Sequence, residues 1–208
     1  MTGGFEFYAS LLRSLRGELI LCSALLFLLG LLCAPFVVKN DFQPLLRYPR
    51  WMWRLIRHWL QPQDRFAKMM MTIAFLNGSS LLVNVLSGLF GVLPFIFAFL
   101  VGLHVGVIVI EESGGLNLMG MLLNPVAFIE LPATWISLSL GMELGLFQFQ
   151  GFSLSGACPF LRHGLLVYGT LIVPLLLVAA FIEVLLIKWG LRFMARKAEE
   201  ECSDRRNY

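Results

Sequence analysis

The sequence predicts an all-α fold, a polytopic membrane helix bundle of about five transmembrane helices plus one amphipathic interfacial helix. Three observations favour this class. Only 14% of the 208 residues are charged, whereas an ordinary soluble domain carries about 25%. The mean hydropathy is +0.79. The apolar residues also form blocks close to the ~20 residues that a helix needs to cross the hydrocarbon. We therefore expect residues 1–208 to form a single integral membrane domain.

The spanning segments are expected to be helices, because a helix satisfies its backbone hydrogen bonds internally. Barrel strands would alternate apolar and polar residues over ~10 positions, and the apolar run at 171–178 does not alternate. Residues 150–164 are expected to form a loop, and residues 116–123 a short surface or re-entrant piece. The spans themselves are predicted at about 19–38, 66–89, 94–110, 125–149 and 165–187.

The first apolar run is expected to remain in the protein as a helix. It is long enough to span, and Ala34-Pro35 near its end is a poor cleavage site for a signal peptidase. The residues before this run, including Arg13 and Arg16, are expected to form an interfacial helical lead.

The most polar segment follows the first span, and it predicts an interfacial helix at about 47–61. Its polar residues recur every three or four positions, which is the spacing of one helix face. Arginines on one side and tryptophans on the other are typical of a helix lying in the membrane interface. Two interpretations stay open, a structural anchor and a docking site for anionic lipid or a partner. The interfacial residues are Arg50, Arg54, Arg57, Trp51, Trp53 and Trp59.

The second span carries a stripe of small and polar residues at helical spacing, namely Asn77, Ser80, Asn84, Ser87 and Gly91. Because there is little hydrophobic drive between helices in lipid, small residues and side-chain hydrogen bonds hold them together. The stripe is expected to face the bundle interior. It serves either helix packing or the polar lining of a cavity.

Two glycine pairs with three residues between them predict close helix contacts, Gly102 with Gly106 and Gly141 with Gly145. Pro132 joins them as an expected helix-packing residue. His104 lies between the first two glycines and faces another direction. It is expected either to make a polar hydrogen bond within the bundle or to titrate.

Acidic residues at membrane depth are the main candidates for function, because a charge in hydrocarbon is costly and usually faces a partner inside the bundle. Glu130 stands two residues before a proline that weakens the local helix. It could hold a proton, an ion or a structural hydrogen bond, with Asn77 and Asn84 as donors. The predicted intramembrane polar site comprises Glu130, Asn77, Asn84, His104 and Glu183.

Sequence signatures of common enzymes are not found. There is no P-loop, no Gly-x-Ser-x-Gly and no His-Glu-x-x-His. We expect a protein that is not an enzyme, with no cofactor, no metal site, no disulfide framework and no nucleic-acid partner. The expected partners are the lipid bilayer, including anionic lipids, and other membrane proteins or a second copy of the chain.

Charge predicts the orientation. The segment between the first two spans and the C-terminal tail are the two basic regions, and five crossings place them on one side. Positive residues near span ends favour the cytoplasm. We expect a multi-pass protein of the cell membrane with a cytoplasmic C-terminus.

Several segments together resemble the stage II sporulation protein M family. Glu130-Leu131-Pro132-Ala133 resembles its Glu-Leu-Pro-Ala signature, and Ala179 to Glu183 resembles its closing Ala-Ala-x-x-Glu. The resemblance extends over about Phe75 to Glu183 and also includes Phe75-Leu76-Asn77, Gly102 to Gly106, and the pair Gly141 and Gly145. Two positions depart from it: Pro125-Val126-Ala127 stands where the family often has Pro-His-Gly, and Val101 where it often has Asn.

The resemblance implies a membrane protein of about five helices. The sporulation member of the family acts in a septal complex that remodels peptidoglycan. We therefore expect a non-enzymatic scaffold or partner subunit of a cell-envelope membrane complex. The alternative is a transporter or permease subunit with a polar intramembrane site around Glu130.

Overall fold

The computed structural model describes residues 2–61, 63–113, 120, 124–149, 151 and 154–204. All regular elements in this part of the chain are helical, which confirms the predicted all-α class. The expected surface or re-entrant piece at 116–123 falls mostly outside the described residues. In chain order the elements are α1 (Thr2–Ser14), α2 (Gly17–Lys39), α3 (Gln43–Trp59), α4 (Phe66–Leu86), the 3₁₀ turn η1 (Ser87–Phe90), α5 (Leu93–Ser113), α7 (Ala127–Gln148), α8 (Leu154–Val167), the π-helical segment η2 (Tyr168–Ile172) and α9 (Val173–Asp204).

Four of the described helical stretches are long and apolar enough to cross a membrane, at Gly17–Lys39, Phe66–Phe90, Leu93–Glu112 and Ser155–Phe193. They correspond to four of the expected spans. The other expected span, at about 125–149, is occupied by α7, which is less apolar. Its lower hydropathy has a structural reason, since α7 contacts α2, α4, α5, α8 and α9 and is buried over much of its length. A helix surrounded by other helices can carry polar residues that a lipid-facing helix cannot.

Close packing of α2 on α5 depends on glycine at three positions. A Cβ added at Gly102 would meet the backbone oxygen of Phe27, and one added at Gly30 would meet the backbone oxygen of Phe99. A Cβ at Gly106 would lie 2.5 Å from the Cβ of Ala34. Because these contacts advance together along both helices, α2 and α5 run parallel, with their backbones nearly touching.

The second glycine pair lies where α7 passes the end of α4. A Cβ at Gly141 would meet the backbone oxygen of Asn84, and one at Gly145 would meet that of Gly91. A Cβ added at Gly88 in η1 would in turn meet the backbone oxygen of Gly141. The chain therefore turns between α4 and α5 directly against α7.

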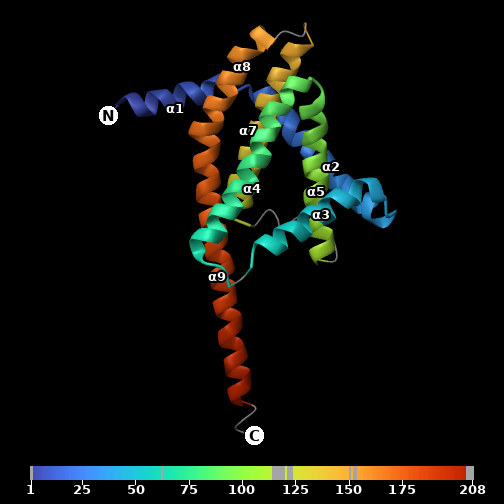
Figure 1. Cartoon of the computed structure of the whole chain (residues 1–208), viewed down its shortest axis with the longest axis vertical. Coiled ribbons are helices and arrows are strands. Elements are labelled where there is room, and N and C mark those ends of the chain that lie inside the picture. The colour runs from blue at the N-terminus through green and yellow to red at the C-terminus, as the bar shows by residue number, and fades with distance from the viewer. Residues whose placement is uncertain are drawn as a thin grey trace.

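The expected loop at 150–164 is wrong for most of its length, because α8 begins at Leu154 and continues through η2 into α9. Figure 1 shows this long helix running along the whole bundle and beyond it. Pro159 lies inside α8 and lacks the N–H that a residue at this position donates, yet the helix continues past it. Gly164 is a packing residue, since a Cβ there would lie 3.0 Å from Val85 Cγ1.

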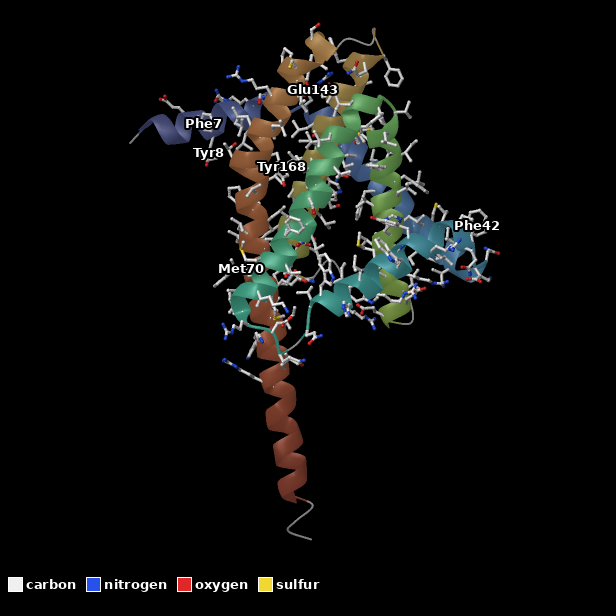
Figure 2. The ribbon with its side chains drawn as sticks, in the orientation of Figure 1. Phe7, Tyr8, Phe42, Met70, Glu143 and Tyr168 are labelled. Atoms are coloured by element: carbon white, nitrogen blue, oxygen red, sulfur yellow. The ribbon has the colours of Figure 1, made fainter. Side chains whose placement is uncertain are left out.

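Two further helices lie at opposite ends of the bundle. Figure 1 shows α1 extending sideways near the N-terminal end of the long helix, and α3 crossing near the opposite end of the bundle, with α9 continuing beyond it. In Figure 2, Phe7 and Tyr8 project from α1, and Phe42 projects from the turn between α2 and α3. Exposed aromatic side chains at both ends of a bundle are typical of the two membrane interfaces.

The interfacial helix is longer at its start than expected. It was predicted at 47–61, whereas α3 spans Gln43–Trp59. Pro44 lies in its first turn, where a proline is compatible with a helix because the early N–H groups have no partner within the helix. Leu46 and Pro49 are buried, and Leu46 packs with Leu103 and Val107 of α5.

Candidate functional site

The central polar contact of the bundle joins Asn77 on α4 to Glu130 on α7. The Asn77 side-chain amide Nδ2 donates to Glu130 Oε1 at 2.6 Å. Both residues are half-buried. A carboxyl group within the hydrocarbon requires a polar partner, and this amide supplies one from the neighbouring helix.

A second contact lies two helical turns further along the same two helices. Asn84 Nδ2 donates to Ser137 Oγ at 3.2 Å, and both residues are buried. The two pairs have the same sequence separation of 53 residues. Helices α4 and α7 therefore run parallel and hold one register, with a polar pair at each of two levels.

Glu183 brings a third helix to the first contact. Its carboxyl group on α9 lies close enough to interact electrostatically with that of Glu130. Ala179 and Ala180, one turn earlier, are fully buried, so α9 approaches its neighbours closely there. The Asn, the Glu-Leu-Pro-Ala and the Ala-Ala-x-x-Glu segments singled out in the sequence therefore lie on three helices, α4, α7 and α9, that pack against one another.

Tyr168 forms a further contact between α4 and the long helix, and sequence reasoning did not find it. Its hydroxyl donates to the backbone oxygen of Gly78 at 2.8 Å, and Figure 2 shows the residue beside α4. Tyr168 opens the π-helical segment, which ends just before Pro174. A single π turn often occurs at functional positions within helices. The proline was the only sequence signal for this irregularity.

Buried serine and threonine hydroxyls were also missed. Ser23 on α2 is fully buried and donates to the backbone oxygen of Trp135 on α7 at 3.0 Å. Thr134 donates to the backbone oxygen of Glu130 at 2.8 Å. Single hydroxyl residues occur in many apolar helices, so their spacing in the sequence does not distinguish a contact between helices from a bond within one helix.

Two residues expected to act with Glu130 or to pack in the bundle lie elsewhere. His104 faces α3, where its ring lies 4.8 Å from the ring of Tyr48. The reason is helical geometry, since His104 is two residues from Gly102 and therefore projects away from α2. Pro132 was grouped with the packing glycines, but its side chain is exposed.

The polar stripe of α4 is only partly internal. Asn84 and Ser87 are buried, whereas Ser80 is exposed. At the level of Ser80 the buried side of α4 is the one that bears Gly78 and Leu81, which faces the long helix. The stripe therefore does not follow the buried face over its whole length.

Ion pairs attach the interfacial helix α3 to the end of α5. Arg50 Nε lies 2.6 Å from Glu111 Oε1, and a second nitrogen of Arg50 lies 3.5 Å from Asp41. The hydrogen bond to Glu111 raises the pKa of Arg50 above its ordinary value. Arg57 lies 3.2 Å from Glu112.

The remaining interfacial residues are spread over the outer side of α3. The Arg57 guanidinium carbon also lies 5.0 Å from the centre of the Trp53 ring, which is a cation–π distance. Arg54, Trp51 and Trp59 are exposed. The ion pairs to α5 support the interpretation of α3 as a structural anchor. The exposed residues on its outer side remain accessible to headgroups or a partner.

An apolar groove of about 280 Å³ lies between α4 and the long helix and is lined mainly by carbon. Phe75, Gly78, Tyr168 and Leu176 are among its lining residues, and Glu130 is not. Among the residues that the structure describes, no group of three or more His, Cys, Asp or Glu side chains is placed to hold a metal ion.

Comparison with known families assigns the chain. The family model for Stage II sporulation protein M matches residues 23–186, which is well over half of the 208 residues. Comparisons with curated proteins and with solved structures gave no match. The matched range contains Asn77 and Glu130, which are hydrogen-bonded, and Glu183. The chain therefore belongs to the stage II sporulation protein M family.

Proposed function

We propose that this membrane protein is a non-enzymatic scaffold or partner subunit of a cell-envelope complex. One observation carries the proposal. Polar side chains inside the bundle bond to one another across α4 and α7: the Asn77 amide donates to the Glu130 carboxyl group, and the Asn84 amide donates to the Ser137 hydroxyl. Polar groups used in this way stabilise a helix bundle.

The exposed parts of the molecule support a role in assembly. Helices α1 and α3 lie at opposite ends of the bundle (Figure 1) and present exposed aromatic residues, among them Phe7, Tyr8 and Trp51. Aromatic residues are enriched at interfaces between proteins as well as at membrane surfaces. A partner subunit could therefore dock on either interface helix without disturbing the packed interior.

The proposed orientation is multi-pass in the cell membrane with the C-terminus in the cytoplasm. Helix α3 and the start of the C-terminal extension lie near the same end of the bundle, because Lys188 donates to the backbone oxygen of Asp64 at 2.7 Å. Basic residues gather at this end, and positive residues near span ends favour the cytoplasmic side.

Site-specific photocrosslinking in the native membrane tests the scaffold role. A photoreactive amino acid is placed at Trp51 on α3, at Phe7 on α1, or at Leu28 in the exposed middle of α2. We expect one of the two interface positions to give a single, reproducible protein adduct that mass spectrometry identifies. Leu28 is the matched control, since its exposed side chain faces lipid.

The proposal fails if neither Trp51 nor Phe7 gives a protein adduct, or if Leu28 gives the same adducts as they do. The first result would indicate a chain without a partner at its interface helices. The second would indicate random collisions in the membrane. A clean monomer or homodimer after crosslinked purification would also count against a complex with other proteins.

A transporter or permease subunit is the second candidate, and it is favoured by two carboxyl groups, Glu130 and Glu183, near each other within the bundle. In this case Glu130→Gln abolishes a proton- or substrate-dependent flux in liposomes without lowering expression. Glu143→Gln is the matched control, because Glu143 lies on the same helix near its other end (Figure 2). Wild-type liposomes without flux for any tested solute would leave this function unsupported.

A further inference from the structure

A second cavity lies at the edge of the bundle, away from the acid–amide contact. It has a volume of about 370 Å³ and lies between the start of α4 and the long helix α9. Its lining residues are Phe66, Leu185, Lys188, Trp189 and Arg192. Helix α9 thus contributes two cationic and two apolar side chains to the lining, and α4 contributes one aromatic side chain.

The α9 side of this groove is one continuous helix face. Leu185, Lys188, Trp189 and Arg192 are spaced by three, one and three residues, so all four project toward the same side. Leu185 and Trp189 are exposed at 47% and 72%. The apolar part of α9 ends at Ile187, so the groove lies where the hydrocarbon meets the headgroups.

The two cationic side chains of the groove, Lys188 and Arg192, differ in their surroundings. Lys188 reaches across to the loop before α4, where its Nζ donates to the backbone oxygen of Asp64. The Asp64 carboxylate is itself occupied by Lys68 at 2.7 Å. Arg192 is exposed, and within the described part of the chain no carboxylate forms an ion pair with it. Within the lining there are two cationic side chains and no acidic one, and Arg192 is the more exposed of the two cations.

We propose that this groove binds one anionic phospholipid, with its phosphate on Arg192 and Lys188 and an acyl chain along Leu185 and Trp189. The two cationic side chains favour an anionic group. The apolar residues, which continue along α9 into the membrane, favour an acyl chain. A free phosphate would match only the cationic side chains. The site is separate from the interfacial helix α3, where Arg50 and Arg57 already pair with Glu111 and Glu112.

Native mass spectrometry of the purified full-length protein tests this site. The detergent-solubilised protein is titrated with phosphatidylglycerol or with phosphatidylcholine of the same acyl chains. We expect tighter binding of phosphatidylglycerol. Arg192→Gln lowers its affinity by about fivefold, the factor for one cation near an anionic surface. Arg192→Lys restores most of the affinity for phosphatidylglycerol. Trp189→Ala lowers the affinity for both lipids.

Arg54→Gln on α3 is the matched control, because Arg54 is an exposed arginine outside the groove. The proposal is overturned if Arg192→Gln binds phosphatidylglycerol as well as the wild type does. It is also overturned if Arg54→Gln causes the same loss, which would indicate diffuse surface charge. Competition by glycerol 3-phosphate at the concentrations where phosphatidylglycerol binds would refute the acyl-chain contact.

Discussion

Substitution of Gly102 by alanine tests the close contact between α2 and α5. The added Cβ would meet the backbone oxygen of Phe27 in α2, and a backbone atom cannot rotate away as a side chain can. The helices α2 and α5 must therefore separate. Gly30 and Gly106 lie on the same contact, so packing is lost along its whole length.

The expected free-energy change is the sum of two opposing effects. Overpacking of a close contact costs about 1–3 kcal/mol, and the backbone partner places Gly102 near the upper end. Alanine also has a better helix propensity than glycine, by about 1 kcal/mol. The net prediction is a loss of about 2 kcal/mol in the free energy of unfolding.

Unfolding in mixed micelles with rising fractions of sodium dodecyl sulfate, followed by circular dichroism, measures this change. Gly190→Ala is the matched control. Gly190 also lies in a helix, but a Cβ there would have nothing within 4 Å. It should gain up to about 1 kcal/mol from propensity alone, so the two variants should differ by about 3 kcal/mol. Equal stabilities for the two variants would refute the close contact between α2 and α5.

The remaining predictions use the same unfolding assay. Tyr168→Phe removes the hydrogen bond to Gly78 and should cost about 0.5–1.5 kcal/mol; an unchanged midpoint would show that this bond contributes nothing. Arg50→Gln breaks the ion pair with Glu111 and should cost up to about 1 kcal/mol at low salt, and less at high salt; a loss independent of salt would contradict an electrostatic origin. Lys68 and the backbone N–H of Gln61 lower the pKa of Asp64 below its ordinary value of 3.8. The charged Asp64 carboxylate therefore stabilises the folded protein fully at pH values above 3.8, and this contribution is lost as the pH falls through the pKa of Asp64 in the folded state. The stability difference between wild type and Asp64→Asn should therefore shrink in acid, and a constant difference would be the opposing result.

The sequence alone was sufficient for the fold class and for most helix positions. Four apolar blocks stand out by length and hydropathy, and the structure has helices there. The predicted loop at 150–164 is wrong for most of its length, because Pro159 and Gly164 lie within α8. A membrane helix tolerates a proline because neighbouring groups can satisfy the freed backbone carbonyl, and it tolerates a glycine that provides space for a neighbour.

The candidate site was only partly predictable. Placing a carboxyl or an amide side chain in the hydrocarbon costs free energy, so Glu130 and Asn77 can be identified as candidates from the sequence alone. Their pairing depends on which helices are neighbours, and a single sequence does not contain that information. Ser137 and Tyr168 carry no such cost when isolated, so their contacts with α4 became visible only in three dimensions.

Asn77 and Glu130 stabilise the bundle through a direct hydrogen bond between α4 and α7, and a double-mutant cycle measures the strength of this bond. Unfolding free energies are measured for Asn77→Ala, Glu130→Ala and the double variant. We expect a coupling energy of about 0.6 kcal/mol, and up to about 1.7 kcal/mol, between the two positions. We also expect near-normal stability for Glu130→Gln, which keeps an oxygen to accept the Asn77 hydrogen bond. Zero coupling between the two positions would show that the hydrogen bond does not stabilise the bundle.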